Sequence, residues 1–158
     1  MKIGVFAGTF DPVTIGHEQV IKKSVGLFDK LIVAICINKD KHTLYSVETR
    51  IEMLKQVCKK YPNVEVVYHE GLLVDLLKEK GATYSVRGVR NNTDYLYENN
   101  MHFVNKKLYP EIVTIFMPCD ENLLEVSSTA VREAIERDND YQNYVSKEVY
   151  DIIEKLKG

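Results

Sequence analysis

Five short apolar segments alternate with stretches of helical periodicity along this chain of 158 residues, and this alternation limits the folds open to it. Residues 31–37 and 112–117 are near-continuous hydrophobic runs rich in β-branched residues, typical of strands covered on both faces. The expected strands lie at residues 3–7, 31–37, 64–68, 83–86 and 112–117. Strands that alternate with helices predict a parallel sheet joined by right-handed crossovers.

Helical patterns lie between these strands and again at the C-terminal end. Residues 46–60 carry apolar side chains at spacings of three and four, with Ser46 placed as an N-cap, and residues 72–80 end at Gly81, a favourable C-cap. The expected helices lie at residues 16–27, 46–60, 72–80, 127–137 and 146–157. We therefore expect residues 1–158 to form a single α/β domain, a Rossmann-like, doubly wound, five-stranded parallel sheet with a helical C-terminal end.

Composition narrows the range of partners. The formal net charge of −2 lacks the basic excess of a nucleic-acid-binding protein, so any anion site must be local. No apolar stretch approaches the roughly 20 residues needed to span a bilayer, and the opening residues 1–6 are too short for a signal peptide. We expect a cytoplasmic protein without nucleic-acid or membrane partners.

The cysteines and histidines predict no metal centre. Cys36, Cys58 and Cys119 form no C-x-x-C pair, which argues against a disulfide framework and a zinc site. Cys36 and Cys58 lie in apolar patterns and are expected to be buried thiols. The histidines after His17 form no i, i+4 pair, and no cluster of Cys and His appears.

The turn after the first strand is the most informative segment. It reads G-T-F-D-P over residues 8–12, and T-I-G-H over residues 14–17 opens the next helix. In parallel sheets ligands bind beyond the carboxyl ends of the strands, and free N–H groups at a helix start favour an anion. The segment is neither the dinucleotide fingerprint nor a P-loop. It predicts a phosphate site in which Gly8 allows close approach and His17 donates a further hydrogen bond.

The string G-T-F-D-P-x-T-x-G-H resembles the signature of the nucleotidyltransferase superfamily with the (H/T)-x-G-H motif. The resemblance implies that Thr9 and Phe10 contact ATP and that His17 stabilises the transition state. Thr14 in place of the first histidine resembles the phosphopantetheine adenylyltransferase branch. Ala7 and Ile15 depart mildly from the family pattern, which often has Pro and Asn there.

A second informative segment follows the fourth strand. Arg87 and Arg90 flank a glycine at a strand end, a donor array suited to phosphates, although pairing with Asp94 and Glu98 in a surface salt bridge is an alternative. The string R-G-x-R-x-x-x-D-x-x-Y-E, continued by Asn105, resembles the phosphopantetheine adenylyltransferase pattern. The resemblance implies that Arg87 contacts the pantetheine phosphate. It implies ATP contacts from Gly88, Val89, Arg90 and Glu98.

Three other segments carry weaker signals. Residues 38–42 form a polar loop in which Lys39 is expected to be solvated, while Lys41 resembles the family lysine that meets the phosphates. Ser127 and Ser128 are expected to cap a helix, and matching them to the family's I-S-S-(S/T) segment implies a site for the ATP triphosphate. The ATP contacts implied in this segment are Leu123, Leu124, Glu125, Val126, Ser127, Ser128 and Thr129. Residues 123–125 lack the aromatic residue of the family pattern, and Leu73 is an implied contact of the pantetheine arm.

The resemblance implies adenylyl transfer from ATP to 4′-phosphopantetheine, giving 3′-dephospho-coenzyme A and pyrophosphate. The attacking phosphate monoester has a second pKa of about 6 and needs no side-chain base. His17, Lys41 and Arg90 are the expected catalytic residues, with Thr9, Lys41, Leu73 and Arg87 on the acceptor. Mg²⁺ is expected to arrive with ATP, because no carboxylate cage is evident.

Two alternatives remain open at this point. The string S-S-T-x-x-R from Ser127 to Arg132 also fits an adenylyltransferase for nicotinate mononucleotide, while Thr14, the short chain and residues 87–98 oppose it. A non-catalytic nucleotide-binding module is the other alternative. The resemblance further implies a homohexamer and feedback by coenzyme A, neither of which composition or periodicity indicates.

Overall fold

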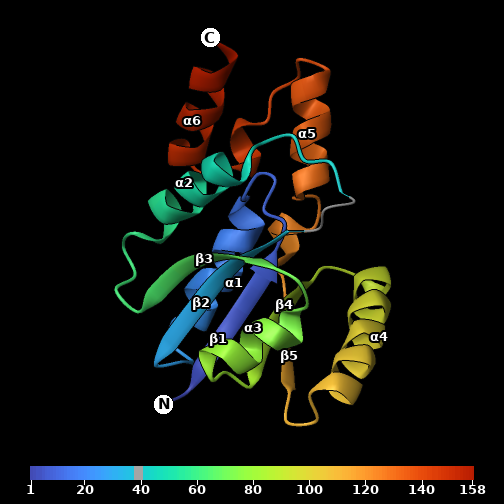
Figure 1. Cartoon of the computed structure of the whole chain (residues 1–158). Helices are drawn as coiled ribbons and strands as arrows, with labels where there is room; N and C mark the ends of the chain where they lie inside the picture. The colour runs from blue at the N-terminus through green and yellow to red at the C-terminus, as the bar shows by residue number, and fades with distance from the viewer. Residues whose placement is uncertain (38–40) are drawn as a thin grey trace.

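The computed structural model describes residues 1–37 and 41–158, so the loop residues Asn38, Lys39 and Asp40 lie outside the described part. One five-stranded sheet in the order β3-β2-β1-β4-β5 forms the centre of the molecule (Figure 1). All neighbouring strands are parallel, as predicted. The strands are β1 (Ile3–Gly8), β2 (Lys30–Ile37), β3 (Val64–Glu70), β4 (Tyr84–Val89) and β5 (Val113–Pro118).

Helices cover both faces of the sheet, which confirms the doubly wound fold. The helices are α1 (Ile15–Ser24), α2 (Val47–Cys58), α3 (Leu73–Lys80), α4 (Asn92–Leu108), α5 (Ser128–Glu136) and α6 (Lys147–Lys157), with 3₁₀ turns η1 (Glu121–Leu123) and η2 (Gln142–Tyr144). Alternate residues of β1 enter different cores: Phe6 packs with side chains of α1, α2, α5 and α6, whereas Val5 and Ala7 pack with those of α3. The predicted helical C-terminal end, α5 and α6, lies beyond the tip of β1 (Figure 1).

Local signals in the sequence act as expected at two helix ends. The Ser46 side chain accepts a hydrogen bond from the backbone N–H of Thr49 at 3.1 Å and caps α2. Gly81 ends α3 in the left-handed conformation with φ 66°. Cys58 is buried as predicted, but Cys36 is only half-buried because it lies at the carboxyl end of β2, where the core gives way to a cavity.

Two elements differ from the sequence prediction. Strand β4 continues to Val89, so Arg87 lies within the strand rather than after it, because residues 84–89 all pair with β5. Helix α4 was not predicted, and it buries none of its residues within the chain.

The sheet opens between β1 and β4. These two strands pair only from Gly4 to Phe6 on β1, whereas the pairing of β1 with β2 continues to Gly8. The order of the strands also changes direction here: β2 and β3 lie to one side of β1, whereas β4 and β5 lie to the other. Such a switch point leaves a crevice at the carboxyl ends of the strands.

None of the described helices is long and apolar enough to cross a membrane.

Candidate active site

Two cavities meet at this crevice. The first, of about 330 Å³, lies between the first turn, α1 and the start of α5, and the second, of about 450 Å³, lies between the ends of β1 and β4 and helices α3 and α4. Thr9, Lys41 and Glu98 line both cavities, and Lys41 Nζ donates to Thr9 Oγ1 at 3.3 Å. The wall between the two cavities is therefore polar and carries an ammonium group.

Most of the expected ATP-binding residues line the first cavity. They are Thr9, Phe10, His17, Gly88, Val89, Arg90, Glu98, Leu123, Val126, Ser127, Ser128 and Thr129. Leu124 and Glu125 do not line it. A turn in which Val126 N–H donates to the Leu123 carbonyl points residues 123 and 126 inward and leaves the two between them exposed.

The residues expected at the acceptor line the second cavity. They are Thr9, Lys41, Leu73 and Arg87. Helix α4 and β5 also add residues to which the sequence analysis gave no site role: Met101 and an interacting pair, His102 Nδ1 and Thr114 Oγ1, at 2.7 Å. Thr114 lies in the predicted strand 112–117, but no signal in the sequence marked it, Met101 or His102 as facing a cavity.

His17 is held as a neutral hydrogen-bond donor. The backbone N–H of Thr14 donates to His17 Nδ1 at 2.9 Å, and the Thr14 hydroxyl lies 3.1 Å from the same nitrogen. Burial, and then the nearby charges of Arg90 and Arg87, lower the pKa of His17 from 6.5 to about 4. A neutral ring whose Nδ1 is an acceptor carries its proton on Nε2, so the imidazole can donate into the cavity that it lines.

Both arginines of the second informative segment are paired with carboxylates. Arg87 Nε and Nη2 donate to the two oxygens of Glu98 at 2.7 and 2.9 Å, and Nη1 donates to the Ala7 carbonyl at 2.6 Å. Arg90 Nε donates to Asp94 Oδ2 at 3.1 Å, and its Nη1 donates to the Val126 carbonyl at 3.3 Å. The salt bridges considered from sequence thus exist, but at the cavity walls. Since a guanidinium has five N–H donors, each arginine keeps donors for an anion.

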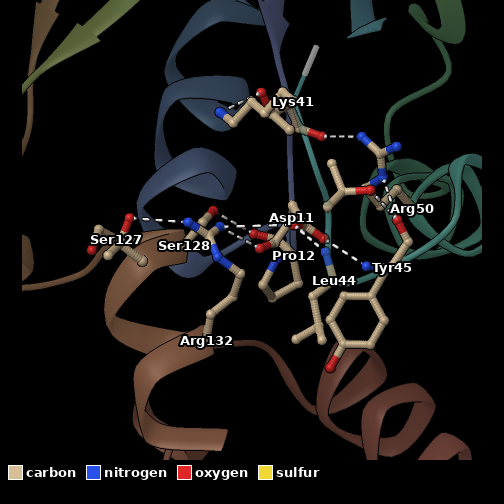
Figure 2. Close-up of polar contacts among 12 residues, drawn as sticks. Asp11, Pro12, Lys41, Leu44, Tyr45, Arg50, Ser127, Ser128 and Arg132 are labelled. Atoms are coloured by element: carbon tan, nitrogen blue, oxygen red, sulfur yellow. Dashed lines mark hydrogen bonds and ion pairs between the residues drawn. The ribbon is translucent and has the colours of Figure 1, made fainter. Parts of the chain in front are cut away.

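The start of α5 is tied to the first turn. Ser127 caps the helix by accepting from Ala130 N–H at 3.0 Å, and the Ser128 hydroxyl donates to the Pro12 carbonyl at 2.7 Å (Figure 2). Arg132 Nη1 donates to the Asp11 carbonyl at 2.8 Å. The hydroxyls are therefore used within the protein, and the backbone N–H groups of this helix start remain the natural anion donors.

The sequence analysis assigned no site role to several polar residues that line the first cavity. They are Asp11, Thr14, Asp94 and Arg132. Asp11 and Thr14 belong to the first-turn motif, so the motif marked their place but not their partners.

Comparisons with known proteins agree on one family. A sequence model of the cytidylyltransferase-like family matches residues 5–134. The phosphopantetheine adenylyltransferase of Caldanaerobacter subterraneus is 46% identical over 133 residues, covering 84% of this chain and 83% of that relative. The enzyme of the same name from Clostridium perfringens is 36% identical over 155 residues, covering 98% and 94%.

Solved structures share the fold at low identity. A putative nicotinate-nucleotide adenylyltransferase from Vibrio parahaemolyticus superposes with a TM-score of 0.72 at 18% identity, covering 98% of this chain and 93% of that one. The Plasmodium falciparum nicotinic acid mononucleotide adenylyltransferase, complexed with NaAD, superposes with a TM-score of 0.71 at 21% identity, covering 99% and 96%.

The depressed pKa of His17 makes stability depend on pH. Between about pH 6.5 and 4 the unfolded chain binds a proton at this residue that the folded chain does not, so folding stability falls as the pH drops through this window. The shift corresponds to about 3 kcal/mol. His17→Asn, which keeps an acceptor near the position of Nδ1, should lose this part of the pH dependence. Urea unfolding of both proteins at pH 7 and pH 4.5 measures it, and identical pH dependences would contradict the assignment.

Proposed function

The chain belongs to the cytidylyltransferase-like family and, within it, to the phosphopantetheine adenylyltransferases, and from this premise we propose that it adenylylates 4′-phosphopantetheine. The reaction transfers the adenylyl group of ATP and gives 3′-dephospho-coenzyme A and pyrophosphate. One observation carries the proposal: two cavities suited to two substrates meet at Thr9, Lys41 and Glu98. An acceptor phosphate in the second cavity would meet the α-phosphate of ATP in the first at this junction.

The acceptor needs positioning rather than a base. Its phosphate is largely dianionic at neutral pH, so it is already nucleophilic. Two phosphates repel each other, and cations at the junction offset that repulsion while the donors align the attack. In the proposal, Lys41 and the free N–H groups of Arg87 hold the attacking phosphate, and the Thr9 hydroxyl bridges the two substrates.

His17, Arg90 and the start of α5 act on ATP in this proposal. As the oxygen of the acceptor attacks the α-phosphorus and the bond to the β-phosphate breaks, charge builds up on the oxygens around phosphorus. A neutral imidazole with its proton fixed on Nε2 donates to such an oxygen and loses no proton in doing so. Arg90 and the N–H groups at the start of α5 bind the leaving pyrophosphate. Gly88, Val89 and Leu123 shape the remainder of the nucleotide cavity.

We propose that Mg²⁺ enters with ATP. Among residues 1–37 and 41–158, no three His, Cys, Asp or Glu side chains come together in a group that could hold a metal ion. The proposal has the ion held by the triphosphate, whose oxygens are the hard ligands that Mg²⁺ prefers.

The proposal also includes a homohexamer that works in the cytoplasm and binds coenzyme A as a feedback inhibitor. Support for assembly comes from α4, which buries none of its residues within the chain and exposes Phe103, Val104 and Leu108 by about half. Apolar groups gathered in this way mark an interaction surface. Coenzyme A contains the pantetheine arm of the acceptor and would compete for the second cavity.

Acceptor identity separates this proposal from its nearest alternatives. Incubation with ATP, Mg²⁺ and phosphopantetheine should release pyrophosphate, whereas ATP alone or ATP with nicotinate mononucleotide should not. Release with nicotinate mononucleotide would favour the alternative transferase. ATP binding without release with either acceptor would favour the non-catalytic module.

His17→Ala should lower kcat by about 10² to 10³, the scale of losing one transition-state donor. The dissociation constant of ATP should change by no more than about threefold, because the proposed bond strengthens only in the transition state. Steady-state kinetics and calorimetric ATP titration measure the two quantities. A variant with near-normal kcat would remove His17 from this role.

Light scattering on the purified protein should give a mass six times that of one chain. Phe103→Asp on the exposed part of α4 should reduce that mass, because a charge is costly in an apolar interface. A wild-type monomer at micromolar concentration would contradict the proposed assembly.

A further inference from the structure

The place of Lys41 depends on the backbone that carries it. Its side chain is exposed, and its bond to Thr9 Oγ1 is long, at 3.3 Å. An exposed contact of this kind contributes little to holding a flexible lysine. Residues 41–46, the described part of the connection from β2 to α2, must therefore be fixed elsewhere if the ammonium group is to stay at the junction of the two cavities.

Asp11 fixes this segment to the first turn. Its carboxylate is almost fully buried, at 2% exposed, and accepts from two consecutive backbone N–H groups: Leu44 to Oδ2 at 2.8 Å and Tyr45 to Oδ1 at 2.9 Å. Both oxygens are thus used, as Figure 2 shows with Asp11 between Arg132 and the 41–46 segment. Hydrogen bonds to a buried carboxylate are about twice as strong as neutral ones.

Arg50 completes the connection from the other side. Its side chain is 4% exposed, and Nη1 donates to the Thr9 carbonyl at 2.9 Å. Its Nε donates to the carbonyls of Tyr45 at 3.0 Å and Ser46 at 3.3 Å. One guanidinium on α2 therefore joins the first turn to the end of the 41–46 segment. Arg50 lines neither cavity, so it has no contact through which to bind either substrate directly.

The two anchors enclose a strained residue. Phe10 lies between Thr9 and Asp11 with φ 51°, in the left-handed region that an aromatic residue rarely adopts. Its ring is buried and meets the rings of Phe6 and His17 edge-on, with centroids 5.3 and 4.9 Å away. A conformation that costs about 1–3 kcal/mol persists only where its surroundings hold it. The anchors on either side thus hold the turn as well as the segment.

We propose that Asp11 and Arg50 are positioning residues that hold segment 41–46 on the first turn and thereby place Lys41 Nζ between the two substrates. The inference rests on the proposed function, because it gives Lys41 its role through the reaction described there. In this inference the position of the exposed Lys41 ammonium depends on two buried side chains, Asp11 and Arg50. Arg50 lines neither cavity and so acts without touching a substrate.

A double-mutant cycle tests the inference. Asp11→Asn replaces one carboxylate oxygen by an NH₂ group, so either Leu44 N–H or Tyr45 N–H loses its acceptor. The variant should lower kcat by about 10- to 100-fold, the loss expected if Lys41 Nζ is displaced by about 1 Å. The ATP dissociation constant should stay within about threefold. In a Lys41→Ala background the same substitution should lower kcat by less than about twofold, because the group it positions is gone.

Arg50→Lys is a second variant, which keeps the positive charge but cannot donate to the Thr9 and Tyr45 carbonyls at once. Its loss of kcat should likewise be large with Lys41 present and small in the Lys41→Ala background. It decides the question if circular dichroism shows that Asp11→Asn does not fold. Asn63→Ala is the matched control. Asn63 Nδ2 donates to the Val25 carbonyl at 2.9 Å and to the Phe28 carbonyl at 3.3 Å, and Asn63 lines neither cavity. It should destabilise the fold while kcat stays within about twofold of wild type.

Amide hydrogen exchange supplies a readout that needs no turnover. Leu44 and Tyr45 N–H should exchange slowly in the wild type and at least tenfold faster in Asp11→Asn, whereas Thr49 N–H, which Ser46 caps, should be unchanged. Unchanged exchange at both residues, an unchanged kcat, or equal losses with and without Lys41 would overturn the inference. An inactive wild type with the expected exchange pattern would instead count against the proposed function.

Discussion

The short pairing between β1 and β4 determines where everything else in the site can lie. Three residue pairs hold the two strands together, and beyond Phe6 and Val86 they separate while each stays paired with its outer neighbour. Arg87 spans the opening through its bond to the Ala7 carbonyl. A longer pairing would close the crevice with backbone hydrogen bonds and leave no place for two ligands to meet. The place where the two cavities meet therefore follows from where a parallel sheet stops pairing.

Charge balance explains how a chain with net charge −2 can build a phosphate site. The three arginines at the cavities each lie near a carboxylate: Arg87 at Glu98, Arg90 at Asp94, and Arg132 with Nη1 3.9 Å from Asp11. These partners orient the guanidinium planes and reduce the repulsion among them. Donors left over on each fork can then meet phosphate without a strongly basic surface.

The sequence predicted the features that depend on local or periodic signals. The strands, the Ser46 cap and the first-turn motif all depend on hydrophobic runs or on residues a few positions apart, so a single chain displays them. Helix α4 was missed although Tyr97, Met101, Val104 and Leu108 follow a helical spacing, since its segment was interpreted only through its arginine and carboxylate residues. The bonds from Asp11 to Leu44 and Tyr45 were missed for another reason: they join positions more than thirty residues apart, and a backbone N–H leaves no mark in the sequence.

Thr14 both caps α1 and orients the His17 ring, and the two roles use the same pair of residues. Its hydroxyl accepts from His17 N–H at 3.4 Å to start α1, and its own N–H fixes the tautomer of the same histidine. The residue that begins the helix and the histidine proposed to act on ATP are therefore joined in one hydrogen-bonded ring. For protein engineering this means that the ends of α2 or α3 are open to stabilising changes, whereas any change to the α1 cap also alters the placement of His17. Natural substitutions at this turn should be constrained in the same way, because those that change folding stability should also change the rate of turnover.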